Sequence, residues 1–213
     1  MELMELFSRG GPLMWAILLA SVVAVAVFIE RLWSTRPAQI TPRVAFEALT
    51  RHLEAGDIQR AQQLCRETPS ALTRVIEVGL RHNGSDRATA KEAMEETGRV
   101  EMGALESGLS TLSTIASIAP LLGLLGTVTG MIRVFRDVAG AQTPDIALLA
   151  HGIWEALLTT GAGLTVAIPT YVAYRFIESR IDGQARAIEE AALEVLDLMA
   201  SQPQSSAVPE DAA

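Results

Sequence analysis

Three long stretches of the chain carry apolar side chains almost without interruption. Residues 10–29 contain no charged side chain over 20 positions, and residues 107–132 contain none over 26 positions. Residues 146–174 form a third stretch of 29 positions, in which Glu155 is the one acidic residue. An α-helix needs about 20 predominantly apolar residues to cross a hydrocarbon core of roughly 30 Å. The pattern therefore predicts three transmembrane helices, and its continuity argues against the alternating strands of a membrane barrel.

Between the first two apolar stretches, the pattern changes to that of short amphipathic helices. Apolar residues recur at helical spacing from Val44 onwards, and Gly56-Asp57 interrupts them, with Asp57 a candidate helix cap. Residues 68–70, Thr-Pro-Ser, form a second break. Residues 83–85, Asn-Gly-Ser, predict a turn, and Ser85 is a candidate cap for the helix that follows.

The second and third apolar stretches continue into longer helical patterns. From Asp86 the pattern stays helical to about Phe135, which predicts one helix of roughly 75 Å at 1.5 Å per residue. Residues 143–145, Thr-Pro-Asp, form a good helix start, with Thr143 as cap and an acid in the first turn. The third pattern runs past the membrane to Leu196. The sequence thus predicts an all-α membrane protein with three transmembrane helices, whose long second and third helices extend into a cytoplasmic helical bundle.

The distribution of Lys and Arg predicts the orientation in the membrane. Arg9 alone precedes the first apolar stretch, whereas eleven basic residues lie between the first two stretches. Arg133 and Arg136 follow the second stretch and count against the assignment, but they are outnumbered. The positive-inside rule therefore places the amino terminus outside and the carboxyl terminus in the cytoplasm. The expected segments are an external amino terminus (1–9), transmembrane helix one (10–30), a cytoplasmic helical region (31–106), transmembrane helix two (107–135), an external loop (136–145), transmembrane helix three (146–175), a cytoplasmic helix (176–200) and a disordered tail (201–213).

The first apolar stretch has a second interpretation, a cleaved signal peptide with a site near residues 24–26. Glu2 and Glu5 oppose it, because the start of a signal peptide carries net positive charge. The stretch is also longer than the usual signal core of about 7–15 residues. We therefore expect a retained membrane anchor.

Composition excludes several classes of function. The formal net charge of −8 argues against a nucleic-acid-binding protein. Cys65 is the one cysteine, so no internal disulfide forms, and a small buried apolar role is expected for it. The sequence contains no CxxC pair, no HExxH motif and no histidine cluster, so we expect neither a metal site nor a cofactor.

Glu155 is the most informative residue for function. It lies ten residues into the third predicted span, about 15 Å along the helix and near the bilayer centre. An ionisable side chain at that depth is costly and typically faces a cavity or a partner. The alternative is a hydrogen-bonded acid that only helps helices to pack.

Small residues surround Glu155 in the second and third spans. Gly123, Gly126 and Gly130 lack the GK[ST] ending of a phosphate loop and lie in an apolar run, which indicates close helix packing. Pro120 and Pro169 are the expected kink sites of the two helices. Threonines in the same region can pass a proton or hold a water, since a hydroxyl both donates and accepts.

Two runs of residues here resemble motifs of the MotA/TolQ/ExbB proton channel family. Residues 119–130, APLLGLLGTVTG, resemble the second-helix motif of the family. Residues 155–160, EALLTT, followed by Gly161, Gly163 and the Ala-Ile-Pro run at 167–169, resemble its third-helix motif. Residues 10–31 are similar, more weakly, to the first helix of the ExbB branch. The resemblance covers most of residues 8–182.

The resemblance implies a homopentamer in the bacterial inner membrane, with the second and third helices around a central pore. Two single-span helices of an ExbD-type or TolR-type partner would occupy the pore, and their aspartate would carry the proton. Residue matching assigns pore positions to Thr127, Glu155 and Thr160. On an ideal helix, Thr160 lies about 140° from Glu155 and Thr159 about 40°, so Thr159 is a further candidate for the proton path.

The function implied by the resemblance is that of a motor subunit and not of an enzyme. Proton flow would energise TonB-dependent outer-membrane transport through a TonB-type protein. The compact cytoplasmic region and the Cys65 to Ser70 stretch favour the ExbB role over a TolQ role in envelope integrity and division. A MotA-type protein would carry a fourth span.

Two other classes stay open at this stage. An intramembrane protease would need a serine and a histidine, and residues 110, 113 and 117 are serines while His151 opens the third span. The sequence contains no nucleophile elbow to support that chemistry. A passive membrane scaffold with a non-conducting acid is the other alternative.

Overall fold

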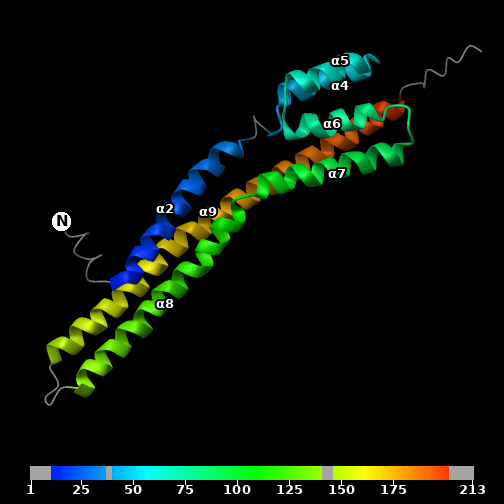
Figure 1. The fold of residues 1–213 in the computed structure, drawn as a ribbon. Coiled ribbons are helices and arrows are strands. Elements are labelled where there is room, and N and C mark those ends of the chain that lie inside the picture. Colours follow the sequence, from blue (N-terminus) through cyan, green and yellow to red (C-terminus); the bar gives the residue numbers. More distant parts are fainter. Residues whose placement is uncertain (1–10, 37–39, 141–145, 202–213) are drawn as a thin grey trace, which may run out of the picture. The chain divides into compact units, whose positions relative to one another are not determined.

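The computed structural model describes residues 11–36, 40–140 and 146–201, and all regular secondary structure among these residues is helical (Figure 1). The chain divides into two units. We call residues 1–33 and 108–178 the hairpin unit, and residues 34–107 and 179–213 the bundle unit. The prediction of an all-α fold is confirmed for the described residues.

The hairpin unit contains three apolar helices. They are α2 (Gly11–Ser34), α8 (Leu109–Gly140) and the first part of α9 (Ile146–Ser201). Each is long and apolar enough to cross a membrane, which agrees with the predicted number of spans. Many large apolar side chains of these helices are exposed, among them Leu19, Leu121, Leu157 and Ile168. In a bilayer such side chains meet lipid or another protein, so their exposure is consistent with a membrane protein.

Glycines bring α8 and α9 into close antiparallel contact, as Figure 1 shows for the course of the two helices. A Cβ added at Gly123 would lie 2.9 Å from the carbonyl oxygen of Thr159, and one at Gly126 would lie 2.3 Å from the Thr159 Oγ1. A Cβ added at Gly130 would lie 3.1 Å from the Cβ of Ala156. The three positions thus lie against α9 with little room for a side chain. Both helices continue through their prolines, Pro120 and Pro169, and kinks there stay a prediction.

The expectation of one continuous helix from Asp86 to Phe135 is wrong at a single point. α7 (Arg87–Glu106) ends before Ser107, and α8 begins at Leu109. Gly108 has a φ of +85°, in the left-handed region that favours glycine, so it interrupts the helix. A Cβ at this position would also lie 2.7 Å from the Arg31 Nε of α2.

The bundle unit is built from α4 (Arg43–Glu54), α5 (Ile58–Glu67), α6 (Ala71–Arg81), α7 and the last part of α9. Their apolar faces form one core, which includes Leu49, Leu53, Ile76 and Leu80, with Ile188, Val195 and Leu196 from α9. Cys65 is buried in this core, as predicted. Burial, with a smaller contribution from Glu77, raises the pKa of its thiol from 9.0 to about 12.

The helix starts of the bundle unit test the predicted caps. Asp57 caps α5, because its carboxylate accepts from the Arg60 backbone N–H at 2.9 Å. The prediction for Ser85 is wrong: the residue at the N-cap of α7 is Asp86, whose side chain makes no capping hydrogen bond. The predicted start at Thr143 lies outside the described residues, as does the tail 202–213.

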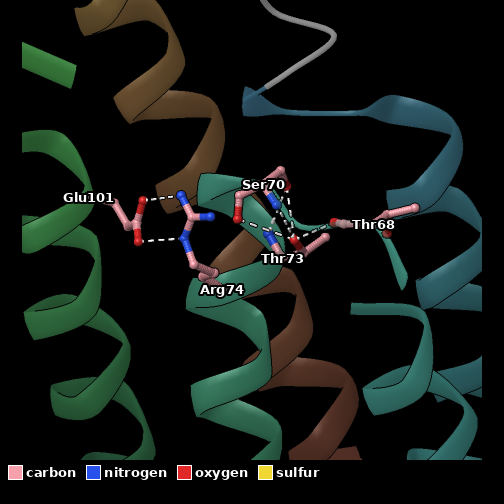
Figure 2. A network of polar contacts seen from close by, with 5 residues as sticks. All are labelled: Thr68, Ser70, Thr73, Arg74 and Glu101. Atoms are coloured by element: carbon pink, nitrogen blue, oxygen red, sulfur yellow. Dashed lines mark hydrogen bonds and ion pairs between the residues drawn. The ribbon is translucent and has the colours of Figure 1, made fainter. Parts of the chain in front are cut away.

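A polar network fixes the start of α6 (Figure 2). Ser70 accepts from the Thr73 backbone N–H at 3.1 Å, and the Thr73 Oγ1 accepts from the Ser70 backbone N–H at 2.8 Å. This reciprocal pair is a capping box. The Arg74 guanidinium then donates to both oxygens of Glu101 on α7, at 2.6 and 2.5 Å, and the hydrogen bond to Glu101 raises the pKa of Arg74. The network therefore orients α6 against α7.

Candidate functional site

Glu155 lies in α9 and points toward α8. Its Oε1 is 3.3 Å from the Nη1 of Arg133, which lies near the end of α8. The Glu155 side chain is 23% exposed and the Arg133 side chain 45% exposed. The acid in the apolar stretch thus has a basic partner, which the sequence analysis did not assign.

The start of α2 forms the third side of this site. A Cβ added at Gly11 would lie 3.1 Å from the Glu155 Oε1 and 3.8 Å from the Arg133 Nη2. Gly11 is the first residue of α2, and the amino-terminal end of a helix carries partial positive charge that favours an anion. The Glu155 carboxylate therefore lies near both a guanidinium and a helix amino terminus.

The order of contacts along the hairpin explains why Arg133 reaches Glu155. Gly163 lies against Ala119 at one end of the interface, and Gly152 lies against Val134 at the other. Antiparallel packing in this register places Glu155 near Arg133, the first charged residue after the apolar run of α8. The interface between α8 and α9 thus contains, at Glu155, a pair of opposite charges and not a single acid.

The three predicted threonines differ in their surroundings. Thr159 is 2% exposed, packs against Gly126 and donates to the Ala156 carbonyl of its own helix at 2.7 Å. Thr160 donates across the interface to the Gly123 carbonyl of α8 at 3.0 Å. Thr127 donates to the Leu124 carbonyl of its own helix at 2.7 Å.

Glu155, Thr159 and Thr160 therefore all meet α8 within one copy of the chain. Among the described residues, no hydrogen bond joins Thr127 or Thr160 to the Glu155 carboxylate. The structure brings these candidates to one helix pair without forming a continuous hydrogen-bonded chain between them.

The geometry weakens the protease alternative. Ser117 donates to the Ser113 carbonyl at 2.9 Å, close to the Ala119 end of the interface. His151 is next to Gly152, which packs against Val134 near the other end. The register thus keeps His151 away from these serines. Within the described part of the chain, no group of three His, Cys, Asp or Glu side chains could hold a metal ion.

Three helices are apolar enough to cross a membrane, and an acid–base pair joins two of them, α8 and α9. These features define an integral membrane protein that carries ionisable groups among its apolar helices. A family model described as the MotA/TolQ/ExbB proton channel family matches residues 67–190. The chain belongs to this family. The match includes α8 and the part of α9 with Glu155.

Relatives carry the same family names. An ExbB homolog of Methanothermobacter thermautotrophicus, described as a biopolymer transport protein, is 32% identical over 87% of this chain and 66% of its own length. The ExbB-like 1 protein of Synechocystis sp. is 34% identical over 84% of this chain and 71% of its own length. The Tol-Pal system protein TolQ of Pseudomonas aeruginosa is 36% identical over 36% of this chain and 33% of its own length. The family is one of channel-type membrane proteins and not of enzymes.

Proposed function

We propose that this chain is the proton-channel subunit of an inner-membrane motor that energises TonB-dependent outer-membrane transport. The observation that carries the proposal is Glu155, a partly buried acid within an apolar helix that packs on α8, in a chain of the MotA/TolQ/ExbB family. A proton that crosses the membrane releases roughly 2.3 kcal/mol per 100 mV of potential.

The proposed assembly is a homo-oligomer, a pentamer by the family resemblance, around the single-span helices of an ExbD-type partner. A TonB-type protein would receive the work. The amino terminus would lie in the periplasm and the carboxyl terminus in the cytoplasm, following the positive-inside rule. Exposed apolar side chains on α8 and α9 are consistent with such contacts, since they need lipid or protein around them.

Within this proposal, the aspartate of the partner carries the proton, Glu155 exchanges protons on the same path, and the threonines support it. Thr160 would hold α8 and α9 together through the Gly123 carbonyl and present its oxygen to the path. Thr127 is partly exposed on α8, where it would face the partner helices. Thr159 is buried at the interface, so its contribution would be the smallest of the three.

The test is growth that depends on TonB-type import, in a host without its own ExbB-type subunit that expresses this chain with its partner. Glu155→Gln keeps the size and hydrogen bonding of the side chain and removes its titration, so growth should fall to that of the empty vector. Glu189→Gln is the matched control, because Glu189 is an exposed residue of the same helix in the bundle unit. Size-exclusion chromatography should show both variants assembled like the wild type.

Variants that lack the hydroxyl groups of the three threonines test their proposed supporting role in the same growth assay. Thr127→Val and Thr160→Val should reduce growth, and Thr159→Val should reduce it least. Full growth of Glu155→Gln would show that the acid is structural, and this part of the proposal would then be wrong.

A TolQ-type role in envelope integrity and division is the second candidate, supported by the partial match to the Pseudomonas protein. Rescue of detergent resistance in a host that lacks TolQ, without rescue of import, would favour it. A non-conducting scaffold is the third candidate. It predicts the same low proton flux in liposomes for the wild type with its partner and for Glu155→Gln.

A further inference from the structure

We propose that Arg133 is the counter-ion that restrains proton transfer through Glu155. This inference rests on the proposed function, because it assigns a gating role at the same site. Arg133 would be a positioning residue: it acts on the proton path through Glu155 and carries no proton itself.

The first line of support is the contact between the two side chains. The Arg133 Nη1 lies 3.3 Å from the Glu155 Oε1, and the start of α2 closes the same site at Gly11. Removal of either side chain leaves the other without this charged contact. Removal of Arg133 therefore should change how Glu155 behaves.

The second line of support is that, among the described residues, no other cationic side chain contacts Glu155. Arg136, one turn further along α8, has its contact with the adjacent Asp137 at 3.7 Å. His151, one turn before Glu155 on α9, is exposed. Among the described residues, Arg133 is the one cation that contacts Glu155.

The chemistry of arginine explains how Arg133 could restrain proton transfer through Glu155. A guanidinium keeps its proton in proteins, so Arg133 can hold the carboxylate but cannot relay a proton. When a proton from the aqueous phase binds Glu155, the pair becomes a neutral acid and a free guanidinium. The long Arg133 side chain is 45% exposed, and it can extend its charged end toward water.

The experiment measures proton flux into liposomes that contain the oligomer without its partner, driven by a potassium diffusion potential and read with a trapped pH dye. Arg133→Gln should raise the proton flux about tenfold over the wild type, which corresponds to a barrier lower by about 1.4 kcal/mol. Arg133→Lys keeps the charge and should stay near the wild type. Arg136→Gln removes the same charge one turn away, and its proton flux should also stay near that of the wild type.

A double variant identifies the route of the leak. Arg133→Gln combined with Glu155→Gln should be as tight as the wild type, because the released path runs through the carboxylate. A leak that persists in the double variant would come from distorted packing and would overturn the proposal. Equal flux for Arg133→Gln and Arg136→Gln would overturn it as well.

The outcome separates this inference from the proposed function. If Glu155→Gln abolishes import while Arg133→Gln remains tight in liposomes, the counter-ion role alone is wrong. If Glu155→Gln supports full import, the proposed role of the acid is wrong, whatever the behaviour of Arg133.

Discussion

Replacing Gly163 by alanine should separate α8 from α9. The added Cβ would lie 2.5 Å from the Ala119 carbonyl oxygen and 3.1 Å from the Gly123 Cα. Both are backbone atoms, which cannot rotate away, and ordinary contact begins near 3.4 Å. The two helices would have to part by about 0.9 Å at this point.

The expected cost follows from two contributions. Overpacking of a tight interface typically costs about 1–3 kcal/mol. The hydrogen bond from Thr160 to the Gly123 carbonyl, now 3.0 Å, would stretch beyond its useful range and cost about 0.6 kcal/mol in a membrane setting. Together these contributions lower the free energy of unfolding by about 2–4 kcal/mol.

Gly161 supplies the matched control. It lies two residues earlier on the same helix, and a Cβ there would meet nothing within 4 Å. Both substitutions gain the same helix propensity, about 1 kcal/mol, so the difference between them isolates the packing at Gly163.

The assay is unfolding of the purified protein in mixed detergent micelles with increasing dodecyl sulfate, followed by tryptophan fluorescence. All three tryptophans, at positions 15, 33 and 154, belong to the hairpin unit, so the signal reports on α2, α8 and α9. Gly163→Ala should unfold at lower dodecyl sulfate than Gly161→Ala. Equal midpoints for the two variants would refute the close approach of the helices.

Three further predictions concern the rest of the chain. Ser70→Ala removes the capping box of α6 and should cost about 1 kcal/mol of bundle stability by circular dichroism, whereas Ser85→Ala, at a position without a capping bond, should stay within about 0.5 kcal/mol. The Cys65 thiol, with its pKa raised to about 12, should resist maleimide until the protein unfolds. Between about pH 9 and 12 only the thiol of the unfolded chain ionises. The contribution of the buried Cys65 thiol to the free energy of unfolding should therefore be intact below pH 9 and decline between about pH 9 and 12. Single cysteines at Gly140 and Ser85, in a Cys65→Ala background, should react with an impermeant maleimide from opposite sides of the membrane, and labelling from one side would contradict the predicted orientation.

Features that depend on short segments could be predicted from the sequence. The three spans follow from composition over about 20 residues, and the cap at Asp57 follows from one side chain beside a helix start. The packing role of Gly126 and its neighbours follows from small residues at helical spacing.

Features that depend on backbone conformation or on distant contacts were missed. The break at Gly108 lies in an uninterrupted helical pattern, and hydropathy does not register a positive φ; a glycine directly after the last turn of α7 was the available signal. The Arg133–Glu155 pair depends on the register between α8 and α9. That register is set by which small residues meet, for example Gly130 and Ala156, and the periodicity of either helix alone does not contain it.

The composition of the bundle core has a consequence for biogenesis. Residues 34–107 leave the ribosome early, but Ile188, Val195 and Leu196, which complete their core, come from the end of α9. Translation at about 5–20 residues per second therefore leaves α4 to α7 with an unfinished apolar face until the two later spans have been synthesised. A product that stalls after α8 would keep that face exposed to chaperones and proteases, whereas a full-length chain would cover it. The core of the bundle unit is therefore completed only after the second and third spans have been synthesised.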